Sequence, residues 1–141
     1  MTKKYDLHCH STASDGVLTP TELVQRAHEQ GVNVLALCDH DTVNGIDEAK
    51  LEADKFGIEL INGVEISTNW EGRGIHIVGL NFDKTHPKMT ALLAEQKSLR
   101  EKRAVEIGHK LEKAGIPNAY EGAKALANGE VTRAHYARYL V

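Results

Sequence analysis

The sequence predicts an α/β fold in which parallel strands alternate with helices. Short strand-like segments and amphipathic segments follow one another along the first half of the chain, which is the pattern of βα units. The second strand-like segment, residues 32–38 (VNVLALC), is a continuous apolar run. Such a run is typical of a central strand that is buried on both faces of a sheet.

The first two helices are marked by their boundary residues. Thr19, Pro20 and Glu22 form the pattern of a helix start, with Thr19 as the N-cap and Glu22 completing a capping box. Gly31 predicts the end of that helix, because glycine is favoured just beyond a helix terminus. A second helix is predicted over residues 46–56, after the second strand.

Three further strands are predicted around these helices. Tyr5–Cys9 alternates in the manner of a strand, and residues 58–67 (IELINGVEIS) and 75–82 (IHIVGLNF) form the third and fourth strands. A glycine-rich turn at 71–74 separates the last two. We expect the strands to be parallel, so that their carboxyl ends meet at one side of the sheet.

The second part of the chain is predicted to be helical. Residues 89–114 carry apolar side chains at a spacing near 3.6, which predicts one long helix. Asn118 begins a segment that resembles a capping box for a short helix, and Thr132 is expected to cap a last helix. We therefore expect an α/β part over residues 1–86 and a helical insertion subdomain over residues 87–141.

The composition is that of a globular protein without a membrane span. The 141 residues are 41% hydrophobic and 26% charged. A formal net charge of −3 gives no broad attraction to nucleic acid, so any polyanion must be bound locally. No apolar run is long enough to span a membrane. Two cysteines without framework spacing fit the reducing cytoplasm, which is the expected location.

Histidine and carboxylate residues recur at the strands, and this recurrence predicts a metal centre. His8 and His10 are one residue apart on a strand, so their side chains leave the same face and can bind one ion. Cys9 points the other way and is expected to face the core. Further potential ligands lie in the first loop and on or after each later strand: Asp15, His40, Glu65 and His76.

The ligand types narrow the choice of metal. Histidine nitrogen and carboxylate oxygen without thiolate suit Mn²⁺, Zn²⁺ or Fe²⁺ in a catalytic cluster. A carboxylate can bridge two ions, and Glu65 is the natural candidate for this bridge. Neighbouring cations lower the pKa of a shared water, so the pattern predicts hydrolytic chemistry.

Four motifs occur in order along the chain: HxHxxxxDG, CDHDT, GVEIS and HIVGL. Together they resemble the PHP (polymerase and histidinol phosphatase) family of metallophosphoesterases, above all a bacterial branch that includes nucleoside 3′,5′-bisphosphate phosphatases and a 5′→3′ exoribonuclease. The resemblance implies a distorted (βα)7 barrel with three divalent ions, Mn²⁺ being favoured over Zn²⁺ or Fe²⁺. It implies one ion held by His8, His10 and Glu65, a second by Glu65 and His76, and a third by Asp15 and His40.

The same resemblance implies ligands that this chain does not carry. The family adds a further histidine and a late Asp-x-His pair, and no strand with ligands is predicted after His76. We therefore expect the N-terminal part of a distorted (βα)7 PHP barrel followed by a helical insertion, truncated at Val141. Such a fragment alone is expected to bind metal weakly and to hydrolyse little.

Other residues are assigned supporting roles. Asp39 and Asp41 flank His40, and one of them is expected to orient an imidazole, although Asp41 could equally begin the next helix. Arg133 and His135 lie in the first turn of the last helix, where an anion is favoured, and are expected to bind a substrate phosphate. The basic residues of the long helix alternate with acidic ones and are interpreted as a solvated face: Lys97, Arg100, Lys102 and Arg103.

The expected function is metal-dependent hydrolysis of a 5′-phosphate or a 5′-terminal phosphodiester. The substrate implied is a nucleotide or a short single-stranded RNA, attacked by a metal-bridging hydroxide. Neither a membrane nor a stable protein partner is implied. Two alternatives remain open: a phosphatase for a small metabolite such as histidinol phosphate, and a non-catalytic PHP module of the kind attached to some polymerases.

Overall fold

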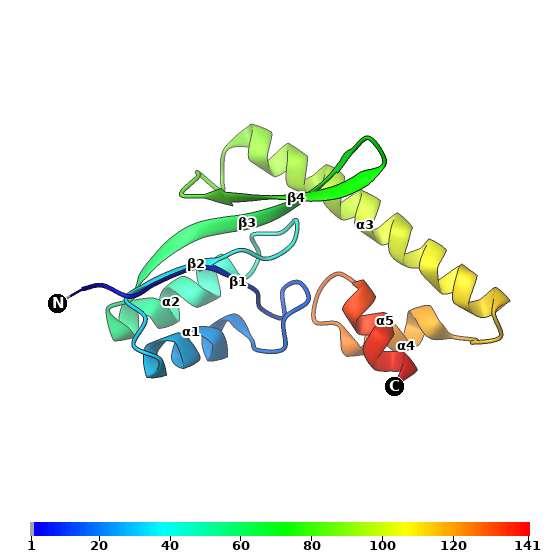
Figure 1. The fold of residues 1–141 in the computed structure, drawn as a ribbon, viewed down its shortest axis with the longest axis horizontal. Coiled ribbons are helices and arrows are strands. Elements are labelled where there is room, and N and C mark those ends of the chain that lie inside the picture. The colour runs from blue at the N-terminus through cyan, green and yellow to red at the C-terminus, as the bar shows by residue number, and fades with distance from the viewer. Residues whose placement is uncertain (1) are drawn as a thin grey trace.

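The structure is a computed structural model that describes residues 2–141 (Figure 1). Most of its elements lie close to the predicted ones. In chain order they are β1 (Tyr5–Cys9), α1 (Pro20–Glu29), β2 (Val34–Leu37), α2 (Ile46–Phe56), β3 (Glu59–Trp70), β4 (Arg73–Leu80), α3 (Pro87–Lys113), α4 (Ala119–Leu126) and α5 (Arg133–Leu140). Among the described residues, none of the helices combines the length and hydropathy that crossing a membrane requires.

The four strands form one curved sheet in the order β1-β2-β3-β4. β1, β2 and β3 are parallel, as expected, but β4 is antiparallel to β3, so the expectation of a fourth parallel strand is wrong. The reason lies in the connection, since only Glu71 and Gly72 separate β3 from β4. Both residues have positive φ angles, 48° and 76°, as a two-residue hairpin turn requires. A parallel crossover needs a dozen residues or more.

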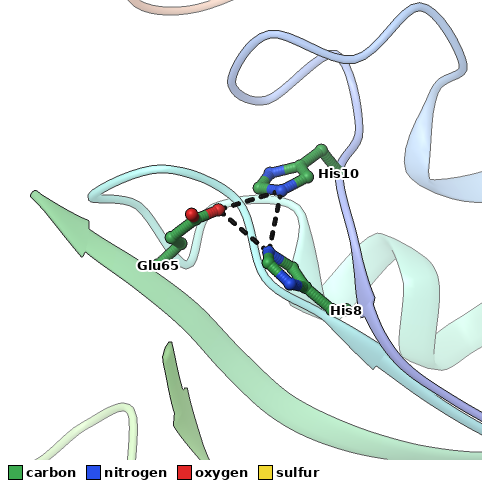
Figure 2. Close-up of side chains that lie close together, drawn as sticks. All are labelled: His8, His10 and Glu65. Carbon is green, nitrogen blue, oxygen red and sulfur yellow. Dashed lines mark hydrogen bonds and ion pairs between the residues drawn. The ribbon is translucent and has the colours of Figure 1, made fainter. Parts of the chain in front are cut away.

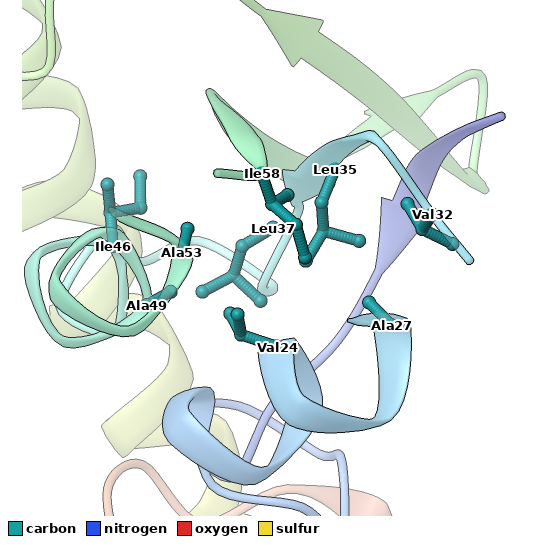
Figure 3. Packing of buried hydrophobic residues seen from close by; sticks show 9 residues of the cluster. All are labelled: Val24, Ala27, Val32, Leu35, Leu37, Ile46, Ala49, Ala53 and Ile58. Atoms are coloured by element: carbon teal, nitrogen blue, oxygen red, sulfur yellow. The ribbon is translucent and has the colours of Figure 1, made fainter. Parts of the chain in front are cut away.

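The main core lies between the sheet and the two helices α1 and α2 (Figure 3). All four residues of β2 are buried, which agrees with its apolar sequence and its central place in the sheet. The α1 helix starts with the expected capping box. The Thr19 hydroxyl accepts a hydrogen bond from the Glu22 N–H at 3.1 Å, and the Glu22 carboxylate accepts one from the Thr19 N–H at 2.9 Å.

The helical part has its own small core beside the far half of α3. Ala104 of α3 packs with Ala119 and Ala123 of α4 and with Tyr136 of α5. The Tyr136 hydroxyl also donates a hydrogen bond to the Ala104 carbonyl at 2.5 Å. From this core, α4 and α5 lead back toward the loop that follows β1 (Figure 1).

One predicted cap differs from the structure. Asn118 precedes α4 as expected, but its side chain makes no capping hydrogen bond. Its backbone instead adopts the left-handed conformation, with φ 58°. Asparagine tolerates this conformation better than most residues. Asn118 therefore contributes to the turn before α4 through its backbone and not through its side chain.

A substitution at Gly63 tests how tightly β2 and β3 are packed. A Cβ atom there would lie 2.5 Å from the Cys38 Sγ and 2.6 Å from the Leu37 carbonyl oxygen. Gly63→Ala is therefore expected to lower the free energy of unfolding by about 2 kcal/mol, measured by urea denaturation. The matched control is Gly79→Ala on β4, where the nearest atom would be 3.5 Å away. Equal unfolding midpoints for the two variants would contradict the expectation.

Candidate metal centre

The centre begins where β1 ends. His8 and His10 point to the same side of the chain, and their Nε2 atoms are 3.2 Å apart (Figure 2). Each of these atoms also lies 3.0 Å from Oε2 of Glu65. Cys9 faces the other way, packs against the core and donates through Sγ to the Ala36 carbonyl, as expected.

These three atoms have the spacing of ligands around one ion. Ligand atoms that lie about 2.1 Å from a divalent cation are separated from one another by roughly 3.0–3.4 Å in octahedral or tetrahedral geometry. The two imidazole nitrogens and the carboxylate oxygen are 3.0–3.2 Å apart. His8, His10 and Glu65 therefore fit a cation as a group.

Glu65 occupies the middle of the site because of its place on β3. A parallel bridge pairs His40 with Glu65, which brings the segment after β2 beside this strand. The His40 Nδ1 atom lies 3.7 Å from Glu65 Oε2. On the other side, the antiparallel register pairs His76 with Ser67, two residues beyond Glu65. This places the His76 Nδ1 atom 3.1 Å from Glu65 Oε1.

Asp15 reaches the centre from the loop after β1. Its carboxylate oxygens lie 3.4 Å from Nε2 of His40 and 3.9 Å from Nδ1 of His10. The loop returns so closely on itself that a Cβ on Gly16 would lie 2.6 Å from the His10 carbonyl oxygen. The residues between His10 and Asp15 thus form a tight loop, and Gly16 stands where the loop comes closest to the backbone of His10.

The potential ligands form three overlapping groups, within each of which the ligand atoms all lie within 4.8 Å of one another. The groups are His8, His10 and Glu65; His10, Asp15 and His40; and His40, Glu65 and His76. Among the described residues, the buried Nδ1 atoms of His10 and His40 have no hydrogen-bond partner. Buried polar atoms are rarely left unpaired, so these nitrogens fit a site that takes metal ions.

The surroundings of Glu65 and of His40 favour the forms of these two side chains that bind cations. Burial would raise the pKa of Glu65, but hydrogen bonds from His8 and His76 and the nearby imidazoles hold that pKa below its usual value. Burial lowers the pKa of His40, in opposition to Asp15 and Glu65. A charged carboxylate and a neutral imidazole are the states that metal binding requires.

Asp39 and Asp41 are both buried beside His40, and their hydrogen bonds go to other groups than imidazoles. Asp39 accepts hydrogen bonds from the N–H and hydroxyl of Ser11 and from the hydroxyl of Ser14, at 2.6–2.7 Å. It thereby anchors the loop that carries Asp15. The two serines were not predicted, although a serine directly after His10 and a second one just before Asp15 offered a signal.

The interpretation of the basic residues of α3 as a solvated face is wrong for Arg100. Its side chain is buried and makes an ion pair with Asp41, with Nε 2.5 Å from Oδ2. One turn later, Arg103 is half-buried and lines cavities beside the centre. Alternating charge along a helix cannot show which basic residue faces a buried carboxylate on another element.

Arg133 and His135 lie beside the centre in different ways. Arg133 lines a cavity of about 150 Å³ together with Asp15, His40 and His76, and an adjoining cavity of about 620 Å³ between the β3–β4 hairpin and α3. His135 is buried, and its Nδ1 atom accepts a hydrogen bond from the Thr132 N–H at 2.9 Å. Thr132 is the N-cap residue of α5 as expected, and its hydroxyl lies 3.0 Å from the same His135 nitrogen.

The curved α/β sheet gathers four histidines and two carboxylates, with Glu65 shared by two of the three groups. The family model of the PHP domain matches residues 6–140. The chain belongs to the PHP domain family, as its motifs predicted.

Known relatives and a solved structure agree with this assignment. The chain is 86% identical over 141 residues to a 5′-3′ exoribonuclease from Haemophilus influenzae, covering all of this chain and 52% of that protein. It is 43% identical over 138 residues to a 3′,5′-nucleoside bisphosphate phosphatase from Chromobacterium violaceum, covering 96% of this chain and 48% of that protein. The chain thus spans about half the length of the curated relatives it matches.

Among solved structures, an amidohydrolase from Chromobacterium violaceum with bound sulfate and no metal superposes with a TM-score of 0.93 at 42% identity. The match covers 98% of this chain and 49% of that structure. The architecture described above is therefore shared with about half of that larger chain.

Proposed function

We propose that this protein is a metal-dependent phosphoesterase that removes 5′-phosphates or cleaves 5′-terminal phosphodiesters in nucleotides or short single-stranded RNA. The observation that carries the proposal is the set of three overlapping ligand groups around Glu65. The names of the relatives, an exoribonuclease and a nucleoside bisphosphate phosphatase, support a substrate of this kind.

Each ligand group is assigned one cation in this proposal, and the preferred ion is Mn²⁺, because nitrogen and carboxylate ligands are mixed and thiolates are absent from the groups. Cations bound there would make hydroxide available from water near neutral pH and neutralise charge on the phosphoryl oxygens. Glu65 joins the groups, and His8 and His10 hold its Oε2 atom from one side. Asp15 and His40 form, with His10, the group that does not include Glu65.

Arg133 is proposed to bind a phosphate of the substrate that does not react. Together with Arg103 it lines the cavity beside the centre. Burial and the neighbouring charges of Arg100 and Arg133 lower the pKa of Arg103, which shows that cationic groups are crowded here. An anion bound beside Arg103 and Arg133 would relieve this repulsion. His135 was expected to bind this phosphate with Arg133, but its side chain is buried and accepts from the Thr132 N–H, so its proposed role is to fix the start of α5.

The proposal is tested on the protein at its natural length with Mn²⁺. Phosphate release from adenosine 3′,5′-bisphosphate and nucleotide release from short 5′-monophosphorylated RNA are measured beside phosphate release from histidinol phosphate. We expect the nucleotide substrates to react faster. Faster release from histidinol phosphate would favour the small-metabolite alternative, and no turnover of any substrate would favour a non-catalytic module.

Replacing Arg133 tests the substrate contact separately from the centre. Arg133→Ala is expected to raise the KM for adenosine 3′,5′-bisphosphate by about tenfold or more, because a charge-assisted contact to phosphate is lost. Hydrolysis of p-nitrophenyl phosphate, which carries a single phosphate, should change far less. Arg26→Ala on the exposed side of α1 is the matched control. An equal loss on both substrates would contradict the assigned role.

We also place the activity in the cytoplasm. Cys9 and Cys38 are free thiols, and burial raises their pKa values to about 12 and about 11. Unpaired thiols of this kind persist in a reducing compartment.

A further inference from the structure

Asp41 lies at the junction between the segment after β2 and the strand β3. Its backbone N–H donates to the Glu65 carbonyl at 3.1 Å, and its carboxylate accepts from the Ser67 N–H at 2.8 Å. Its φ angle is 53°, a left-handed conformation that is uncommon outside glycine, asparagine and aspartate. Asp41, which directly follows His40, is therefore hydrogen-bonded to both Glu65 and Ser67 on β3.

Arg100 completes this junction from a distant part of the chain. Its Nε atom donates to Asp41, and its Nη2 atom donates to the Ser67 hydroxyl at 3.1 Å. The Arg100 side chain is 9% exposed and that of Asp41 is fully buried. One guanidinium group on α3 thus holds both segments that carry ligands of the centre.

The choice of residues at this contact is informative. Arg100 is the buried side chain in the first half of α3, whereas the buried residues Ala104 and Gly108 lie further along the helix. A buried ion pair costs desolvation, and apolar residues of similar volume often stabilise a fold as well or better. We therefore interpret the Arg100–Asp41 ion pair as a contact that fixes the relative position of the two segments rather than one that raises the free energy of unfolding.

We propose that the Arg100–Asp41 ion pair is a positioning device for the metal centre: it holds His40 and Glu65 at the separation that a shared cation requires. Arg100 is a positioning residue, since its hydrogen bonds and ion pair go to Asp41 and Ser67 and not to the ligand side chains. The inference rests on the metal centre of the proposed function and is independent of the substrate. Outer contacts of this kind typically change metal affinity by about 10- to 100-fold when they are removed.

The test measures metal binding directly on the protein at its natural length. Affinity for Mn²⁺ is determined by competition with a chelating dye, and the visible absorption spectrum is recorded with Co²⁺ in the site. Arg100→Met keeps the length and removes the charge, and we expect its Mn²⁺ affinity to fall by about tenfold or more with an altered Co²⁺ spectrum. Arg100→Lys should bind Mn²⁺ more tightly than Arg100→Met but less tightly than the wild type. Lysine keeps the positive charge but lacks the planar guanidinium that donates to Asp41 and Ser67 together.

Lys97→Met is the matched control, because Lys97 lies one turn earlier on α3 with an exposed side chain that pairs with Glu130. A role limited to stability would lower the unfolding temperature of Arg100→Met without changing affinity or spectrum, and would overturn the inference. If Arg100→Met does not fold, unchanged affinity in Arg100→Lys overturns it equally. A wild-type protein that binds no metal would instead overturn the proposed function.

Discussion

Glu65→Gln is expected to weaken the binding of Mn²⁺ by at least about 10²-fold and to reduce the hydrolysis of nucleotide substrates by a similar factor or more. The amide keeps the size of the side chain and removes its charge. Glu65 is shared by two of the three ligand groups, and its carboxylate lies within 3.7 Å of four imidazoles. A neutral amide cannot neutralise or bridge cations at this position.

The measurement combines metal analysis after gel filtration with a dye-competition titration and an assay on adenosine 3′,5′-bisphosphate. Glu59→Gln is the matched control on the same strand, since Glu59 is exposed at the start of β3 and pairs only at 3.9 Å with Lys3. Wild-type metal affinity in Glu65→Gln would show that Glu65 is not the bridge between the groups.

The second large effect is expected at Gly16. A Cβ atom there would lie 2.6 Å from the His10 carbonyl oxygen and 2.8 Å from the carbonyl carbons of His10 and Ser11. All three are backbone atoms, which cannot move aside without changing the path of the loop. Gly16→Ala is therefore expected to lower the free energy of unfolding by about 3 kcal/mol and to draw Asp15 away from His40.

Two readouts separate these consequences. Urea denaturation reports the loss of stability, and the number of Mn²⁺ ions bound per chain reports the loss of the group that contains Asp15. We expect the variant to bind one ion fewer. Val17→Ala, a change at an exposed neighbouring position, should leave both values near those of the wild type. A Gly16→Ala protein with full stability and full metal content would show that this close approach is not required.

Local patterns in the sequence predict the elements well where local physics decides them. The bounds predicted for α2 and β1 agree with the structure, because a strand-like alternation and a glycine terminus are properties of adjacent residues. The side chains predicted as ligands lie close together, because the carboxyl ends of parallel β1 and β2 meet beside β3 and the antiparallel β4 brings His76 to the same place. Their role as ligands stays a prediction. The assignment of individual ions to these groups stays a prediction.

Long-range pairing is what the patterns do not determine. The orientation of β4 depends on its partner, and alternation along a strand is the same in either direction. The glycine-rich turn predicted at 71–74 was the signal for a hairpin, and the structure narrows the connection to Glu71 and Gly72. The burial of Arg100 depends on Asp41, which is 59 residues away, and no local spacing reports such a contact.

The end of the chain also reaches back to its beginning. Arg138 on α5 donates a hydrogen bond to the Asp15 carbonyl at 3.1 Å, and Gly129 lies against the Ala13 carbonyl. A chain is synthesised from its N-terminus, so every ligand group is made before these contacts exist. The histidines at 8, 10, 40 and 76 can therefore meet Glu65 early in synthesis, whereas the Asp15 loop gains its contact with Arg138 only after α5 has emerged. The position of Asp15 would then settle later than the contacts around Glu65.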